Sequence, residues 1–97
     1  MHISIRNIRD NEIEKVRNLC AEIWSGYNLP EHRWSIDDMH RCFPIIGAFY
    51  SDNLIAALCA IHMESNFYWV HFLCVIKEYR KMHIGTKLME KLESKIL

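Results

Sequence analysis

Residues 67–97, FYWVHFLCVIKEYRKMHIGTKLMEKLESKIL, decide the fold because they join a strand pattern to a helix pattern through a basic connection. Residues 67–75 are apolar at nearly every position, which is typical of a strand with both faces covered. Further along, apolar residues recur at helical spacing and predict the buried face of a helix: Leu88, Met89, Leu92 and Ile96. The connection, residues 80–85, reads RKMHIG.

The RKMHIG segment has the properties of an anion-binding loop. The first turn of a helix leaves backbone N–H groups unpaired and carries a partial positive charge, so it attracts phosphate groups. Gly85 removes a side chain and lets a ligand approach the backbone. Arg80, Lys81 and Lys87 add positive charge around it. We therefore expect a phosphate-bearing ligand here; a basic loop capping an ordinary helix is the alternative interpretation.

The sequence before residue 45 predicts one strand and two helices. Residues 3–8 suit a short strand, and Asp10 or Asn11 can cap the helix that follows. Glu12 and Glu14 suit the first turn of this helix. Its apolar stripe comprises Ile13, Val16, Cys20 and Ile23. A second, shorter helix is expected from Ser35, and Pro44 stops it.

Three apolar runs, 45–50, 54–63 and 67–75, are separated by short polar turns and predict an antiparallel meander. The run 54–63 also fits a buried helix by periodicity, but its length and flanking turns favour a strand. The expected order is therefore β-α-α-β-β-β-α, an α/β (α+β) fold with helices on both faces of the sheet.

The bulk composition narrows the function classes. The chain has 97 residues, enough for one small domain, and 51% are apolar, as in globular proteins. The chain has 12 Lys plus Arg and 12 Asp plus Glu, so it has no net positive charge that would attract nucleic acid. No apolar run is long enough to cross a membrane, and residues 1–6 do not resemble a signal peptide. The four cysteines (Cys20, Cys42, Cys59 and Cys74) form no CxxC pair, so we expect reduced thiols, no metal and a cytoplasmic location.

The segment LCVIKEYR, residues 73–80, runs directly into RKMHIG and completes a recognisable motif. It resembles the GNAT superfamily of acyl-coenzyme A-dependent N-acyltransferases, whose signature Arg/Gln-x-x-Gly-x-Gly/Ala stands between the fourth strand and the third helix. The expected element order also resembles the first half of that fold over the whole chain. The resemblance implies transfer of an acyl group, acetyl from acetyl-CoA or a related thioester, to an unidentified amine.

The resemblance also implies roles for individual residues. Backbone contacts with the coenzyme A pyrophosphate fall to Lys81, Met82, His83, Ile84, Gly85 and Thr86. Arg80 occupies the first signature position, and Leu73, Cys74 and Val75 lie along the pantetheine arm, which pairs with them like an added strand. His83 departs from the pattern, because the family usually has glycine there. Its side chain either weakens binding or meets a phosphate itself.

The catalytic base is less clearly marked. The resembled family often has a glutamate near the start of the fourth strand, but residues 69–73 contain no acid. Strand alternation predicts one face shared by residues 69, 71, 73 and 75, on which His71 is the titratable group. A buried, hydrogen-bonded histidine is the alternative, as it is for His62 on the preceding strand.

Other side chains allow more than one interpretation. Cys74 suggests a covalent acyl-cysteine, but its neighbours are apolar and offer no charge to lower its pKa, which favours packing. Trp24, Tyr27 and Trp34 surround the helix connection, which lines the acceptor side in the resembled family; aromatic packing explains them equally well.

The resembled fold continues beyond its third helix with further strands, so residues 1–97 correspond to a partial GNAT-like domain without the C-terminal strands. The fourth strand is then an exposed apolar edge, which predicts a homo-oligomer formed through it. Two alternatives to the enzyme stay open: a catalytically silent coenzyme A-binding or assembly module, and a truncated fragment without independent activity.

Overall fold

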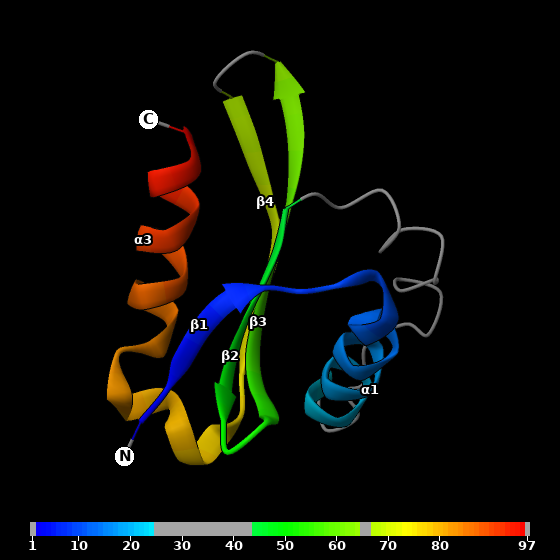
Figure 1. The fold of residues 1–97 in the computed structure, drawn as a ribbon, viewed down its shortest axis with the longest axis vertical. Helices are drawn as coiled ribbons and strands as arrows, with labels where there is room; N and C mark the ends of the chain where they lie inside the picture. Colours follow the sequence, from blue (N-terminus) through cyan, green and yellow to red (C-terminus); the bar gives the residue numbers. More distant parts are fainter. Residues whose placement is uncertain (1, 25–43, 65–66, 97) are drawn as a thin grey trace.

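The structure, a computed structural model, describes residues 2–24, 44–64 and 67–96. Its elements are β1 (Ser4–Asn7), the 3-10 helix η1 (Asp10–Glu12), α1 (Ile13–Trp24), β2 (Ile45–Tyr50), β3 (Asn53–Glu64), β4 (Phe67–Val75), the 3-10 helix η4 (Lys77–Met82) and α3 (Ile84–Ile96). The helix expected from Ser35 lies outside the described residues. Every other expected element is present (Figure 1).

The strands form one sheet of four, in the order β1-β2-β3-β4, and each neighbouring pair is antiparallel. The meander expected from the three apolar runs is therefore confirmed. The run at 54–63, which also fitted a helix, is a strand because it pairs with β2 on one side and β4 on the other. Burial between two strands explains why it is apolar throughout.

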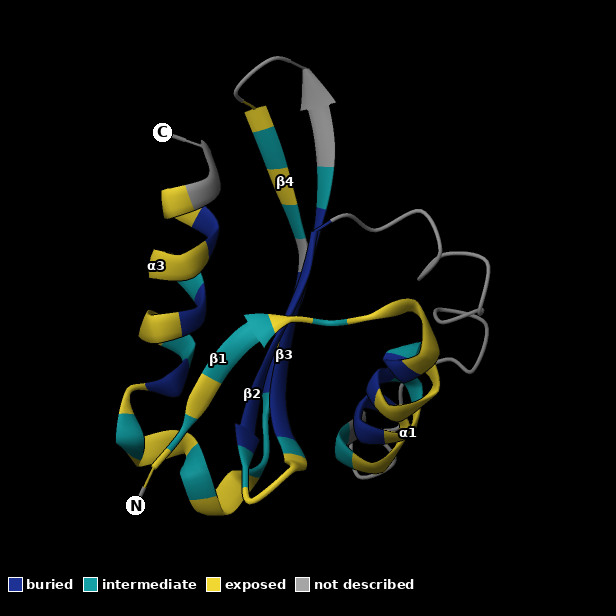
Figure 2. Ribbon diagram, in the orientation of Figure 1, coloured by how far each residue is buried: buried dark blue, intermediate teal, exposed yellow. Residues whose placement is uncertain are grey.

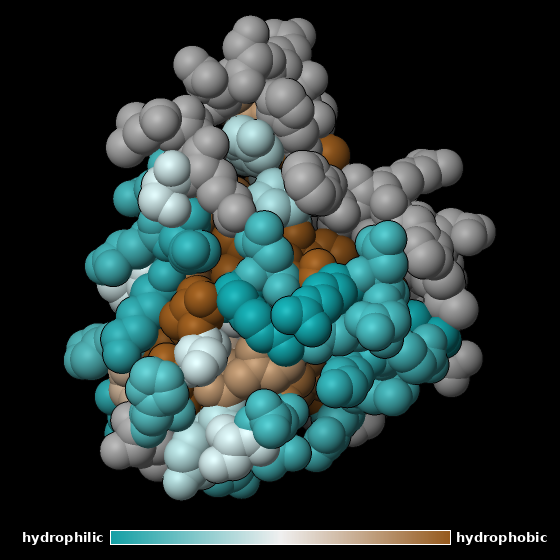
Figure 3. Space-filling model, in the orientation of Figure 1, coloured by the Kyte–Doolittle hydropathy of each residue, from teal (hydrophilic) through white to brown (hydrophobic). Residues whose placement is uncertain are grey.

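The two long helices cover opposite faces of the sheet (Figure 1). Val16 and Cys20 of α1 pack with Ala57 and Phe72, whereas Leu88 of α3 belongs to a separate cluster on the other face. Residues 55–60 of β3 are buried throughout, so both faces of the central strands are closed, as expected (Figure 2). Hydrophilic side chains cover the outer surfaces of the helices, and hydrophobic ones lie between them (Figure 3).

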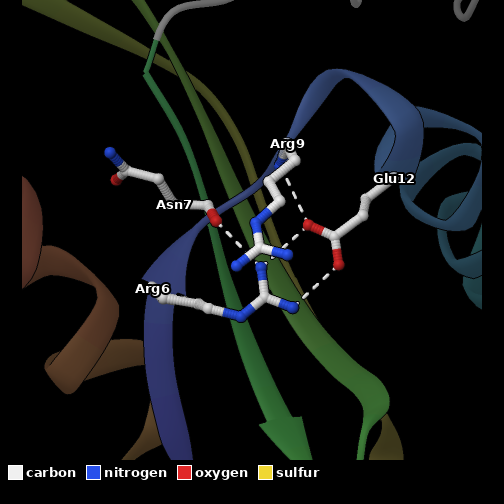
Figure 4. A network of polar contacts seen from close by, with 4 residues as sticks. All are labelled: Arg6, Asn7, Arg9 and Glu12. Carbon is white, nitrogen blue, oxygen red and sulfur yellow. Dashed lines mark hydrogen bonds and ion pairs between the residues drawn. The ribbon is translucent and has the colours of Figure 1, made fainter.

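The N-cap of the first helical segment is Arg9, not Asp10 or Asn11 as expected, because the segment begins one residue earlier, with the 3-10 turn η1; the first turn contains Glu12. Glu12 folds back and accepts two hydrogen bonds from the Arg6 guanidinium of β1, at 2.8 and 2.7 Å, and a third from the Arg9 N–H at 2.9 Å (Figure 4). The Arg6 guanidinium also lies 4.0 Å above the Phe49 ring. The hydrogen bond from Arg6 is the main cause that lowers the pKa of Glu12 to about 2. This ion pair fastens β1 to the start of the helical segment.

None of the helices within residues 2–24, 44–64 and 67–96 is long and apolar enough to cross a bilayer.

Candidate functional site

The predicted site lies where β4 ends and α3 begins. The Ile76 N–H donates to the Ile55 carbonyl at 2.9 Å, which keeps the chain attached to the sheet just after the last β4 residue. The chain then turns through η4, where the sequence predicted an irregular loop. The Tyr79 N–H closes this turn by donating to the Ile76 carbonyl at 2.9 Å. This 3-10 turn reverses the chain so that α3 runs back along the sheet (Figure 1).

Arg80 braces the turn. Its Nε donates to the Val75 carbonyl at 3.0 Å, so the side chain reaches back over five residues to the end of β4. The ring centroids of Tyr79 in this turn and Tyr50 at the end of β2 are 6.2 Å apart, in a tilted aromatic contact. The first residue of the signature therefore holds the connection against the strand that precedes it.

His83 stands between η4 and α3 in the left-handed conformation, with φ 57° and ψ 28°. The left-handed conformation is strained for residues that have a Cβ atom, but not for glycine. The geometry explains why glycine suits this position of the signature. Histidine is among the residues that enter the left-handed region more readily than most, and the exposed His83 side chain points away from the core.

The start of α3 presents unpaired donors. The first hydrogen bond at this end runs from the Lys87 N–H to the His83 carbonyl at 3.1 Å. Helix geometry leaves the N–H groups of Ile84, Gly85 and Thr86 without partners inside the helix. A Cβ built on Gly85 would lie 3.5 Å from Cδ2 of Leu73 on β4. The glycine of the turn and the strand residue predicted to line the pantetheine arm are thus neighbours.

The side chains of the predicted loop divide into two groups. Ile84 is buried, and Met82 packs with the cluster on the α3 face, so both anchor the turn to the sheet. Exposed side chains belong to Arg80, Lys81, His83, Thr86 and Lys87. A ligand at this turn would therefore meet backbone N–H groups surrounded by polar and cationic side chains.

The expected common face of residues 69, 71, 73 and 75 is wrong. Phe72 of β4 pairs with Cys59, but Val70 pairs with Ala60, so β4 has one extra residue between them, His71. This β-bulge changes the alternation. As a result Val70 and Val75, five residues apart, pack against the same cluster on the α3 face. The structure describes the His71 backbone at the bulge but not its side chain, and the same holds for His62 on β3.

Cys74 faces α1. It is 5% exposed, and its Sγ lies 3.6 Å from the Sγ of Cys20, which is 1% exposed. The expectation that nothing nearby lowers the Cys74 pKa is wrong. The hydrogen bond with Cys20 lowers the pKa of Cys74, and the Ala57 N–H and the Arg80 charge act in the same direction against the effect of burial. Sequence reasoning missed Cys20 because the two cysteines are 54 residues apart.

Other predicted residues lie partly or wholly outside the described set. Tyr27 and Trp34 fall within residues 25–43, and Trp24 is described only as the last residue of α1. Among the described residues, no three His, Cys, Asp or Glu side chains gather in a way that could hold a metal ion.

Solved structures of several acetyltransferases have the same fold. A GNAT-family acetyltransferase of Staphylococcus aureus Mu50 superposes with a TM-score of 0.82 at 17% identity, over 98% of this chain and 66% of that one. A GNAT-family acetyltransferase of Brucella melitensis in complex with acetyl-CoA gives 0.81 at 12% identity, over 98% and 68%. An aminoglycoside 6'-N-acetyltransferase complexed with coenzyme A gives 0.74 at 22% identity, over 99% and 55%.

The chain therefore spans between about half and two thirds of the length of these structures. The comparison with curated protein sequences gave no match. The sequence model of the Acetyltransferase (GNAT) family matches residues 10–97, which include every strand after β1, the turn and α3. On this match, and in agreement with the fold, the chain belongs to the GNAT acetyltransferase family.

Proposed function

We propose that residues 1–97 are a single acyl-coenzyme A-binding domain that transfers an acyl group, in the simplest case acetyl, from the thioester to an amine. The observation that carries this proposal is the start of α3. Unpaired backbone N–H groups at Ile84–Thr86 lie beside β4, with Gly85 next to Leu73 and cationic side chains around them.

This arrangement offers separate binding positions for two parts of coenzyme A, the diphosphate and the pantetheine arm. The diphosphate is an anion and fits the helix N-terminus, while Lys81 and Lys87 add exposed positive charge. The pantetheine arm has amide groups and no charge, so it fits along the edge of β4 at Leu73–Val75, where backbone groups point out of the sheet. Related folds have been solved with acetyl-CoA and with coenzyme A, which supports the same ligand here.

The acceptor is proposed to be an amine because acyl transfer in the family goes to nitrogen, and one of the similar structures is named for N-acetylation of an aminoglycoside. Attack on the thioester needs the amine in its neutral form, and the departing thiolate needs a proton. We assign the base to His71, whose ordinary pKa suits proton transfer near neutral pH and whose backbone lies at the β4 bulge.

We further propose that the protein forms a homo-oligomer through β4. This strand is an edge of the described sheet, and its first half, apart from the Leu73–Val75 segment assigned to the pantetheine arm, exposes two large hydrophobic side chains, Phe67 and Trp69. An edge of this kind offers unpaired backbone groups and apolar surface to a second copy.

Calorimetric titration with coenzyme A tests the binding half of the proposal. We expect saturable binding that weakens with added salt, because part of the attraction is between exposed charges. Lys81→Glu and Lys87→Glu should each weaken binding by about three- to tenfold. Lys91→Glu is the matched control, since this exposed residue lies one turn further along α3, and its substitution should change affinity by less than about twofold. Absence of binding at millimolar coenzyme A would refute the proposal.

Release of free coenzyme A from acetyl-CoA, measured over a panel of primary amines, tests the catalytic half. Amine-dependent release that His71→Ala lowers by about 10²-fold or more would support His71 as the base. The control is His2→Ala, an exposed histidine near the N-terminus, which should leave release unchanged. Coenzyme A binding without release for any amine would favour the silent binding module instead.

A further inference from the structure

A pair of buried thiols joins α1 to β4. The Sγ atoms of Cys20 and Cys74 are 3.6 Å apart and share a hydrogen bond. Cys20 lies in the apolar stripe of α1, and Cys74 lies on the face of β4 that α1 covers. The acyl-transfer proposal gives no task to either sulfur atom.

We propose that Cys20 and Cys74 form a reversible disulfide that cross-links α1 to β4 when the protein meets a peroxide. The sulfur atoms already touch, and a disulfide bond of about 2.05 Å requires them to approach by about 1.5 Å more. Side chains move by rotation about their Cα–Cβ bonds, and we assign the approach of the two sulfur atoms to such rotation. The proposal does not depend on whether the protein transfers acyl groups.

The surroundings assign the order of the chemical steps. Cys74 is the sulfur whose pKa is lowered, by the hydrogen bond with Cys20, in which either sulfur can be the donor, by the Ala57 N–H and by the charge of Arg80. The same hydrogen bond and burial raise the pKa of Cys20, which therefore keeps its proton while Cys74 reacts. A thiolate is the reactive form of cysteine, so Cys74 is the first to be oxidised.

The reaction balances with hydrogen peroxide as the two-electron oxidant. The Cys74 sulfur attacks one peroxide oxygen, the O–O bond breaks, and the proton that Cys74 released goes to the departing hydroxide to form water. The Cys20 sulfur then attacks the resulting sulfenic acid. The S–S bond forms, the S–O bond breaks, and hydroxide leaves with the Cys20 proton as a second water.

Burial sets the rate and the persistence of the bond. Both sulfur atoms are almost fully shielded, so peroxide reaches them only when α1 moves away from the sheet. Oxidation should therefore be slower than that of an exposed thiol, and the finished disulfide should resist reduction until the same opening occurs. The bond would close a loop between residues 54 positions apart, which restricts the unfolded chain.

Peptide mapping of the whole chain gives the direct test. A protease that cleaves after glutamate places Cys20 in residues 15–22, Cys74 in residues 65–78 and the other two cysteines together in residues 32–64. After treatment with hydrogen peroxide and alkylation of the remaining thiols, we expect residues 15–22 linked to residues 65–78. Dithiothreitol should separate them. The oxidised protein should melt about 10 °C or more above the reduced protein.

Single-cysteine variants provide the controls. Cys20→Ala and Cys74→Ala should each abolish the linked peptide and the rise in melting temperature. Cys59→Ala is the matched control, because Cys59 is another buried cysteine of the same core cluster, and this variant should keep both.

Two results would overturn the proposal, and wild-type protein alone can give either. One is that Cys20 and Cys74 can still be alkylated in urea after peroxide has fully oxidised free glutathione in the same solution. The other is that either of them is linked to residues 32–64 or to a second chain in preference to its neighbour.

Discussion

His83 has a backbone conformation that its residue type tolerates but does not favour. Its φ of 57° places it in the left-handed region at the junction of η4 and α3. The sequence comparison with the family signature identified this position as unusual, but only the backbone geometry gives the reason that glycine suits it.

Substitutions at His83 test whether the left-handed backbone conformation strains residues that have a Cβ atom. Valine, which is branched at Cβ, should lower the free energy of unfolding by about 1–2 kcal/mol because left-handed geometry crowds it. Glycine should change it by less than about 1 kcal/mol, because relief of strain is offset by greater freedom of the unfolded chain. Urea unfolding measures both. Lys81→Val, at an exposed residue of ordinary φ, is the control; an equal loss there would contradict the explanation.

The Arg6–Glu12 pair predicts a dependence of stability on pH. The folded protein holds the pKa of Glu12 at about 2, below its ordinary value of 4.5, so the unfolded chain takes up a proton first as the solution is acidified. The stabilisation is therefore complete above about pH 4.5 and is lost as the pH falls toward 2. Because the Arg6 side chain is 38% exposed, we expect about 1–2 kcal/mol rather than the full linkage value.

Urea unfolding of wild type and Glu12→Gln at several pH values measures this contribution. The variant should be less stable at pH 7, and the difference should shrink between about pH 4.5 and 3. Glu14→Gln is a suitable control, since Glu14 is an exposed carboxylate paired with Arg17 at 2.9 Å. A difference between wild type and Glu12→Gln that stays constant with pH would argue against the ion pair as its source.

At the scale of elements, β4, η4 and α3 act as one unit. The strand ends at a backbone hydrogen bond to Ile55, the turn is held by Arg80, and α3 begins beside the strand it has just left. Ile84 and Leu88 fix the helix on the sheet, which leaves the small Gly85 next to Leu73 as the open part of the junction.

Gly85 substitutions test whether this junction is the coenzyme A site. A Cβ at this position makes only an ordinary contact, 3.5 Å from Leu73, so Gly85→Ala should keep the fold and change coenzyme A affinity by less than about threefold. Gly85→Val adds branches that crowd Leu73 and the free N–H groups, and should weaken binding by about tenfold or more. Circular dichroism checks folding, and calorimetry measures affinity. Equal affinity of both variants would place the ligand elsewhere.

At the scale of the whole molecule, the two edges of the described sheet differ. β1 has four residues, includes the charged Arg6 and ends in the Glu12 network, features that discourage pairing with another chain. β4 has nine residues and exposes Phe67 and Trp69 by 58% and 57%. The β4 edge is therefore the surface from which we expect self-association.

Sedimentation at micromolar concentration tests this expectation. Wild type should sediment as a dimer or larger species, and Trp69→Lys should shift it toward the monomer by placing a charge on the apolar edge. Ser4→Lys adds the same charge at an exposed position of β1 and should leave the distribution unchanged. A monomeric wild-type protein would contradict the proposed oligomer.

Much of the fold was predictable because it depends on local patterns. The apolar runs located β2, β3 and β4, and helical spacing identified the buried faces of α1 and α3, since side-chain periodicity follows directly from backbone geometry. The turn before α3 was recognisable from Arg80, Gly85 and their position between a strand and a helix.

The remaining features depend on which distant segments meet, and only the tertiary structure decided them. The bulge at His71 is a mismatch between β4 and β3, so alternation within β4 alone wrongly placed residue 69 on the same face as residues 73 and 75. The contact between Cys20 and Cys74 joins residues 54 apart, and the Arg6–Glu12 pair needs β1 and η1 in place. By itself the sequence determined the strands and the two long helices of the described residues and the turn to which we assign phosphate binding; packing of α1 against β4 determined the sulfur pair, because such contacts have no local period to read.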